Sequence, residues 1–145
     1  MINEAIKTRR LTLGLSENEI SQKCGLSIDE YTDIESYPDE LETVTHIKEI
    51  RCLCKNLDFN IFSELGIHYE TDSNDYTQAN KNRHKLVRTK RKLLNLTEDE
   101  LGNKIGFETP IIRKMESEPD FFETWSIELI RELAMQLDEN IESFL

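Results

Sequence analysis

The sequence predicts an all-helical protein that contains two copies of one helical unit. Three observations support this prediction. The 145 residues include only 5 Gly and 3 Pro, too few for the many turns of an all-β protein. Apolar residues recur at helical spacing along most of the chain. The chain also matches itself when it is shifted by 81 residues, which indicates an internal repeat.

The repeat is clearest near the start of each copy, where "TRRLTLGLSENEISQKCG" (8–25) aligns with "TKRKLLNLTEDELGNKIG" (89–106). After Asp120 the offset falls to 80, as expected from a one-residue deletion in a loop. The match then continues to the end of the chain. We therefore predict two units joined by a polar linker. Their ranges are 1–65 for the first unit, 66–80 for the linker and 81–145 for the second unit.

The first unit is expected to form five short helices. It begins with an amphipathic stretch at residues 3–13, whose apolar positions include Leu11 and Leu13. Residues 45–57 carry apolar side chains every three or four positions, as one face of a helix requires. A short helix at 61–65 ends the unit, and two further helices lie between the first and the fourth.

Capping signals predict those two helices. Ser16 with Glu19 forms a capping box at the start of the second helix, and Ser27 with Glu30 forms another at the start of the third. Gly25 lies between them, where a turn requires a residue that tolerates positive φ.

The second unit repeats the pattern. Thr97 with Glu100 caps its second helix, and Thr109 followed by Pro110 starts its third, since proline suits the first helical turn. Its fourth helix is apolar on one side. The side chains expected to line that side are Leu129, Ile130, Leu133, Ala134 and Leu137.

Each unit also meets the steric needs of two helices that cross at a tight turn. Such helices need a small residue at the crossing and a glycine-like residue in the turn. The first unit supplies Ser21 and Gly25 at these places, and the second supplies Gly102 and Gly106. The same pattern in both copies favours a helix-turn-helix in each.

Both units resemble the helix-turn-helix domain of phage repressors and Cro proteins, the bacterial regulator class also called the Xre family. The resemblance rests on "RRLTLGLSENEISQKCGLSIDEYTDIES" and "KRKLLNLTEDELGNKIGFETPIIRKMES" and covers about 3–65 and 84–145. It implies two tandem five-helix lambda-repressor-like domains, repressor-type function and frequent dimerisation. It also implies that a helix-one arginine pairs with a glutamate at the end of helix three. The implied structural pairs are Arg10 with Glu35 and Arg91 with Glu116.

The first unit departs from the family on the face that usually meets DNA. Family members often carry Gln, Ser, Thr, Asn, Arg or Lys there, which donate to phosphates and base edges. Carboxylates repel phosphates, so this face is expected to bind a protein partner or to be only a solvated acidic surface. A role facing DNA, in which a carboxylate accepts from a cytosine amino group, is a further alternative. The acidic residues concerned are Glu17, Asp29, Glu30 and Asp33.

The second unit offers a better match to a DNA-reading face. Arg113 could donate two hydrogen bonds to a guanine edge or to a phosphate, and Lys114 could bind either with less geometric demand. The basic segment "KNRHKLVRTKRK" (81–92) would lie along the phosphate backbone, and a solvated helix face is the alternative. The expected DNA-binding residues are Arg113, Lys114, Thr109, Ser117, Thr97, Lys85, Arg88 and Lys92.

The overall charge opposes general affinity for nucleic acid. The net charge is −11, and residues 1–65 carry 7 basic and 13 acidic side chains. Residues 81–145 carry 11 basic and 13 acidic side chains, so the second unit is nearly balanced. Contact with DNA is therefore expected from the second unit.

Several function classes find no support in the sequence. No nucleophile with a nearby base, phosphate-binding loop or ligand-spaced Cys and His set is present, so no enzyme, cofactor or metal site is expected. No apolar run approaches the roughly 20 residues of a membrane span. The odd count of 3 Cys predicts reduced thiols in a cytoplasmic protein, with Cys52 and Cys54 about 200° apart on one helix.

Two functions of different classes remain. The first is a bacterial or phage transcriptional regulator that binds double-stranded DNA through its second unit, while the acidic first unit forms a homodimer or binds a protein partner. The alternative is a protein-interaction module of the same fold that does not bind DNA, such as an anti-repressor, an antitoxin-like partner or an acidic DNA mimic. A third arrangement places both units on DNA as a pseudo-dimer over half-sites about 34 Å apart.

Overall fold

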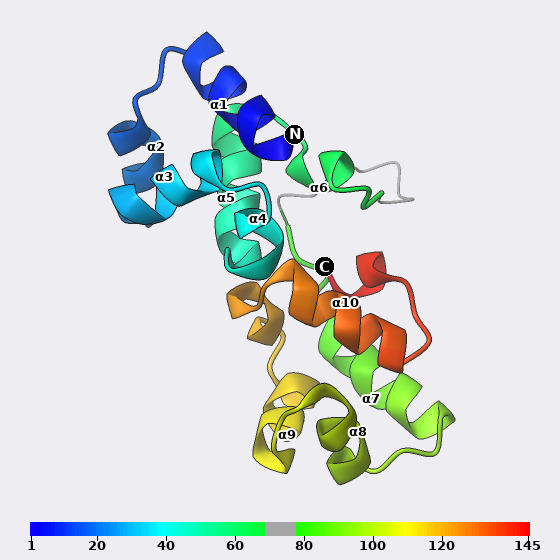
Figure 1. The fold of residues 1–145 in the computed structure, drawn as a ribbon. Coiled ribbons are helices and arrows are strands. Elements are labelled where there is room, and N and C mark those ends of the chain that lie inside the picture. The colour runs from blue at the N-terminus through cyan, green and yellow to red at the C-terminus, as the bar shows by residue number, and fades with distance from the viewer. Residues whose placement is uncertain (69–77) are drawn as a thin grey trace.

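The computed structural model describes residues 1–68 and 78–145, and every regular element in them is helical (Figure 1). The first half contains α1 (Ile2–Thr12), α2 (Glu17–Lys23), α3 (Ile28–Ser36), α4 (Glu40–Thr43), α5 (Ile47–Leu57) and α6 (Ile61–Glu64). The second half contains α7 (Arg83–Leu93), α8 (Glu98–Ile105), α9 (Thr109–Ser117), the 3₁₀ helix η1 (Phe121–Thr124), α10 (Ile127–Gln136) and the 3₁₀ helix η2 (Ile141–Phe144).

The all-helical class is confirmed over these residues, but the expectation of five helices per unit is wrong by one element. A single turn, α4, lies between α3 and α5, and η1 occupies the corresponding place before α10. One turn is too short to show a helical period, so the pattern misses it. Most of the predicted linker, at 69–77, lies outside the described residues. The unit boundaries stay a prediction.

The predicted capping boxes are all formed. The Ser16 hydroxyl accepts from the backbone N–H of Glu19 at 3.0 Å, and Ser27 and Thr97 each accept from the third helical residue at 3.1 Å. Gly25 and Gly106 adopt φ values of 67° and 81°, which suit glycine in the turn. Local chemistry thus determines where α2, α3 and α8 begin and where α2 and α8 end.

Two details of the predicted helices are wrong. Leu11 and Leu13 are 58% and 41% exposed, because α1 turns Ile6 and Arg10 inward and these leucines lie off that face. Leu129 is 38% exposed because it lies off the buried face of α10. The predicted start of α9 is confirmed, since α9 begins at Thr109 with Pro110 in its first turn, and its N-cap residue Glu108 makes no side-chain capping bond.

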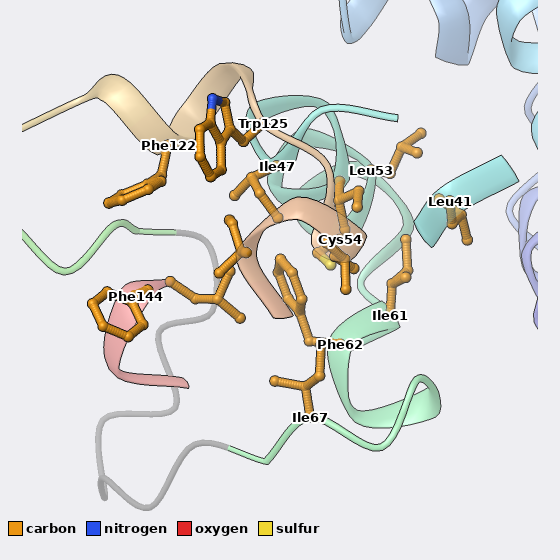
Figure 2. Close-up of a cluster of buried hydrophobic side chains, with 14 of the residues drawn as sticks. Leu41, Ile47, Leu53, Cys54, Ile61, Phe62, Ile67, Phe122, Trp125 and Phe144 are labelled. Carbon is orange, nitrogen blue, oxygen red and sulfur yellow. The ribbon is translucent and has the colours of Figure 1, made fainter. Parts of the chain in front are cut away.

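The two halves share one hydrophobic core. Figure 1 shows α1–α3 at one end of the molecule and α8 and α9 at the other, with α5 and α10 between them. Helix α5 packs against η1, and α4 packs against α10. Figure 2 shows Ile47 and Phe62 of the first half in the same cluster as Trp125 and Phe144 of the second. The backbone N–H of Ile47 also donates to the carbonyl of Trp125 at 2.9 Å.

A buried ion-pair cluster lies at the same boundary. The Glu123 carboxylate accepts from Arg51 Nε at 3.1 Å and from Arg83 Nη1 at 2.9 Å. Arg83 is fully buried, and its Nε also donates to the carbonyl of Pro119 at 3.2 Å. Burial lowers the pKa of Arg83, and the charge and hydrogen bond of Glu123 oppose that shift. One carboxylate therefore helps to hold two buried cations between the halves.

We predict that Glu123→Gln destabilises the whole chain by about 3 kcal/mol, because it leaves Arg83 buried without the carboxylate that neutralises it. Urea unfolding followed by circular dichroism measures the change, and the exposed Glu128→Gln on α10 is the matched control. Equal stabilities of the two variants would contradict this account of the cluster.

Candidate nucleic-acid interface

A buried arginine holds the helix-turn-helix of the second half together. Arg91 on α7 donates from Nε and Nη2 to the two Glu116 oxygens at 3.0 and 2.8 Å. Its Nη1 donates to the carbonyl of Leu96 at 2.9 Å. This bidentate contact is among the stronger polar interactions in proteins. It ties α7, the loop before α8 and the end of α9 to one another.

The first half contains the equivalent arrangement. Arg10 on α1 donates to the two Glu35 oxygens at 2.5 and 3.0 Å and to the carbonyl of Leu15 at 2.9 Å. The Tyr31 hydroxyl adds a bond to Glu35 at 2.8 Å. Hydrogen bonding to the glutamate raises the pKa of each arginine. Both pairs that the family resemblance implies are therefore present.

The crossing of α8 and α9 leaves no room for a side chain. A Cβ added at Gly102 would overlap the carbonyl oxygen of Phe107, far inside contact distance. In the first half Ser21 occupies the corresponding place, is buried, and donates its hydroxyl to the carbonyl of Asn18 at 2.9 Å. The small residue predicted at each crossing thus has a steric purpose in the second half.

Helix α9 projects two cations into solvent. The Arg113 side chain is 69% exposed, and its Nε donates to a Glu98 oxygen at 2.8 Å. An ion pair this exposed contributes only about 0–1 kcal/mol, so a phosphate or a guanine edge can displace the carboxylate. Lys114 is exposed and forms no ion pair within the part of the chain that the structure describes. These two side chains are the strongest candidates for DNA contact.

The predicted hydroxyl contacts fit DNA less well. Thr109 donates its hydroxyl to Asp99, and Ser117 donates to the carbonyl of Arg113 at 2.8 Å. Thr97 caps α8 as an acceptor, so its hydroxyl proton still has no acceptor among the described residues. Of the three, only Thr97 can donate to a phosphate without breaking a bond within the chain.

The basic segment at 81–92 divides into inward and outward side chains. Arg83 is buried against Glu123, Arg91 pairs with Glu116, and Lys90 binds Glu139 at 2.8 Å, which lowers the pKa of that carboxyl. Three of the seven cations in this segment are therefore held by carboxylates of the chain. The cations left exposed on α7 itself are Lys85, Arg88 and Lys92.

Carboxylates surround the candidate interface, and several of them had no predicted role. Glu98 and Asp99 line a groove with Thr109 and Arg113, and Glu108 is exposed at the start of α9. Acidic residues in the first turn interact favourably with the helix dipole and so stabilise the helix. This effect explains their presence without reference to DNA. They nevertheless repel phosphates, so this surface favours a defined contact over general affinity.

Only some carboxylates on the acidic face of the first half are available to bind a partner. Glu17 accepts from the Thr32 hydroxyl at 3.2 Å and lies 3.6 Å from Arg10 Nη2. Glu30 accepts from the backbone N–H of Ser27 at 2.7 Å as part of its capping box. Two of the four predicted partner-binding residues thus have structural partners. The two that remain exposed without such bonds are Asp29 and Asp33.

Apolar side chains accompany those two carboxylates. Ile28 and Tyr37, at the two ends of α3, are 47% and 56% exposed. Negative charge also accumulates near Asp33. The pKa of Glu40 is raised by burial and by the negative charges of Asp33 and Asp39. The exposed carboxylates Asp29 and Asp33 repel phosphates, so this face is unsuited to DNA.

The chain has no match among protein-family models, curated proteins or solved structures. Within residues 1–68 and 78–145, no group of three or more His, Cys, Asp or Glu side chains is placed to hold a metal ion. None of the helices described there is both long enough and apolar enough to cross a membrane.

We predict that Arg91→Met and Glu116→Leu each lower the free energy of unfolding by about 3–5 kcal/mol, because each leaves one buried charge without its partner. The double variant should recover much of that stability, since both buried charges are then gone. Urea unfolding of the four proteins gives the coupling energy, and Lys104→Gln on the exposed side of α8 is the control. Additive destabilisation in the double variant would show that the pair does not act as a unit.

Proposed function

We propose that the chain is a cytoplasmic DNA-binding transcription regulator with two tandem helix-turn-helix domains of the phage repressor and Cro type, at 1–65 and 81–145. The observation that carries this proposal is the outer face of α9, where Arg113 and Lys114 project from a helix held by a buried ion pair. The equivalent pair in the first half supports a common origin of the two domains.

In this mechanism α9 enters the major groove, as the second helix of such a motif does. Arg113 exchanges Glu98 for a guanine edge or a phosphate, and Lys114 binds an adjacent phosphate. Lys85, Arg88 and Lys92 add electrostatic attraction along the backbone. The nearby carboxylates weaken binding to arbitrary DNA, so the affinity depends on a site whose base edges match Arg113.

The first domain stays off the DNA in this proposal and binds a second copy or a protein partner. Asp29 and Asp33 replace the donors that a DNA-reading helix needs, and Ile28 and Tyr37 add exposed apolar area beside them.

The acidic face of the first half also favours a second candidate function. In that candidate the whole chain is a protein-interaction module, such as an anti-repressor, an antitoxin-like partner or an acidic DNA mimic. Its acidic first-half face would then bind a basic protein, and α9 would bind no DNA.

Selection of binding sites from random double-stranded DNA tests the main proposal. We predict that the full chain enriches a sequence motif that Arg113→Ala/Lys114→Ala fails to enrich. In a plot of log binding constant against log salt concentration, the slope for the variant should be shallower by about 0.9 for each phosphate that it no longer neutralises. Lys48→Ala/Lys55→Ala on α5 removes the same charge elsewhere and should keep the motif. Failure of the unaltered chain to enrich any motif at low salt would instead support the protein-interaction module.

Neutralising the acidic face tests the role assigned to the first domain. We predict that Asp29→Asn/Asp33→Asn changes affinity for the selected DNA by less than about threefold at physiological salt, because charges beyond a Debye length of about 8 Å are largely screened. Fluorescence anisotropy with a labelled duplex measures the change. A larger gain in affinity would place α3 beside DNA and support the pseudo-dimer arrangement.

A further inference from the structure

Two cysteines that are distant in the sequence are neighbours in the first half. Cys24 is the C-cap residue of α2, and Cys52 lies on α5. The Asn56 amide nitrogen lies 3.2 Å from the sulfur of Cys52 and 3.8 Å from that of Cys24. The Cys52 thiol also donates to the carbonyl of Lys23 at 3.4 Å. One amide therefore bridges two thiols, and both thiols are partly exposed.

The pocket that Cys52 lines is basic, although the chain as a whole is strongly acidic. Cys52 lines a pocket of about 410 Å³ together with Lys48, Arg51 and Lys55 of the same helix. Glu123 is the single carboxylate among its described lining residues. A pocket of this size can hold a small organic ligand, and its charge favours an anionic one.

We propose that Cys52 and Cys24 form a redox-active pair that is oxidised to a disulfide by an anionic low-molecular-weight disulfide of the glutathione type, which Lys48 and Lys55 attract to Cys52. This modification site is independent of the proposed contact between α9 and DNA.

The reaction proceeds by two thiol–disulfide exchanges. The Cys52 thiolate attacks one sulfur of oxidised glutathione, the sulfur–sulfur bond of the oxidant breaks, and the first glutathione thiolate leaves. Cys24 then loses its proton to solvent and attacks the Cys52 sulfur, which releases the second glutathione thiolate. Two protein thiols are oxidised to one disulfide, and the oxidant is reduced to two thiols.

The structure favours this order of attack. Cys52 is the thiol that lines the pocket with the cations, so an anionic disulfide attracted to the pocket meets Cys52 first. Burial raises the pKa of the Cys24 thiol, and its hydrogen bond with Cys52 raises that pKa further. This favours Cys24 as the thiol that reacts second. Burial also raises the pKa of Cys54 to about 11, which keeps this third thiol out of the reaction.

Mass spectrometry of the full chain treated with oxidised glutathione tests the pair. We expect the unaltered chain to lose two hydrogens and to yield a peptide cross-linked between Cys24 and Cys52, and reduction with dithiothreitol should reverse both changes. Cys24→Ser should stop at one glutathione on Cys52, because the second thiol is missing. Cys52→Ser should gain neither product, and Cys54→Ser should behave as the unaltered chain.

Other outcomes would overturn the proposal. These are a cross-link that includes Cys54, glutathione on Cys24 in Cys52→Ser at the rate seen for Cys52, or no reaction of the folded chain. Circular dichroism confirms the fold of each variant, and Cys24→Ala replaces Cys24→Ser if the serine does not fold.

The basic pocket has a separate test within the same experiment. Lys48→Gln/Lys55→Gln should slow oxidation by oxidised glutathione several-fold and leave the rate with the neutral 2-hydroxyethyl disulfide unchanged. Equal rates of the variant and the unaltered chain with oxidised glutathione would show that the lysines do not attract the oxidant.

Discussion

The orientation of the outer helix in each half depends on one buried arginine. In the second half the Arg91 guanidinium binds Glu116 with two nitrogens and the Leu96 carbonyl with a third, so it joins three segments. A buried charge of this kind is strongly unfavourable without its partner, which makes the pair a constraint on geometry more than a source of net stability. Because Glu116 lies near the end of α9, the pair determines how α9 presents Arg113 and Lys114. Gly102 adds a steric constraint at the crossing with α8.

A second constraint joins the two halves. Ile47 and Trp125 meet in the shared core, and Glu123 neutralises buried cations from both sides of it. The halves therefore have a common interface in place of a simple linker connection. This interface uses Arg83, a residue of the basic segment that would otherwise add to the charge facing DNA. The electrostatic surface available to nucleic acid is correspondingly smaller than the composition of that segment indicates.

The sequence predicts what is encoded locally. Capping boxes and a turn glycine, Gly106 in the second copy, recur in both copies, and the structure contains each of them. The Arg91–Glu116 pair, which is not local, is expected from the family resemblance alone. Contacts between distant segments leave no periodic signal. The burial of Arg83, the shared core and the proximity of Cys24 to Cys52 were therefore beyond sequence reasoning. The candidate site also combines a local feature with a contact between segments. The exposure of Arg113 follows from its position on the helix, whereas its bond to Glu98 depends on how α8 and α9 cross.

In the function that we propose, α9 of the second half contacts DNA and α3 of the first half does not. Titration of the isotope-labelled full chain with a selected duplex tests this arrangement, with the backbone amide chemical shifts as the readout. We expect shifts that are concentrated on α9 and on the exposed side of α7 around Arg88, and that weaken together as salt is raised. Shifts centred on α3 around Asp33, or none on either helix at low salt, would contradict it.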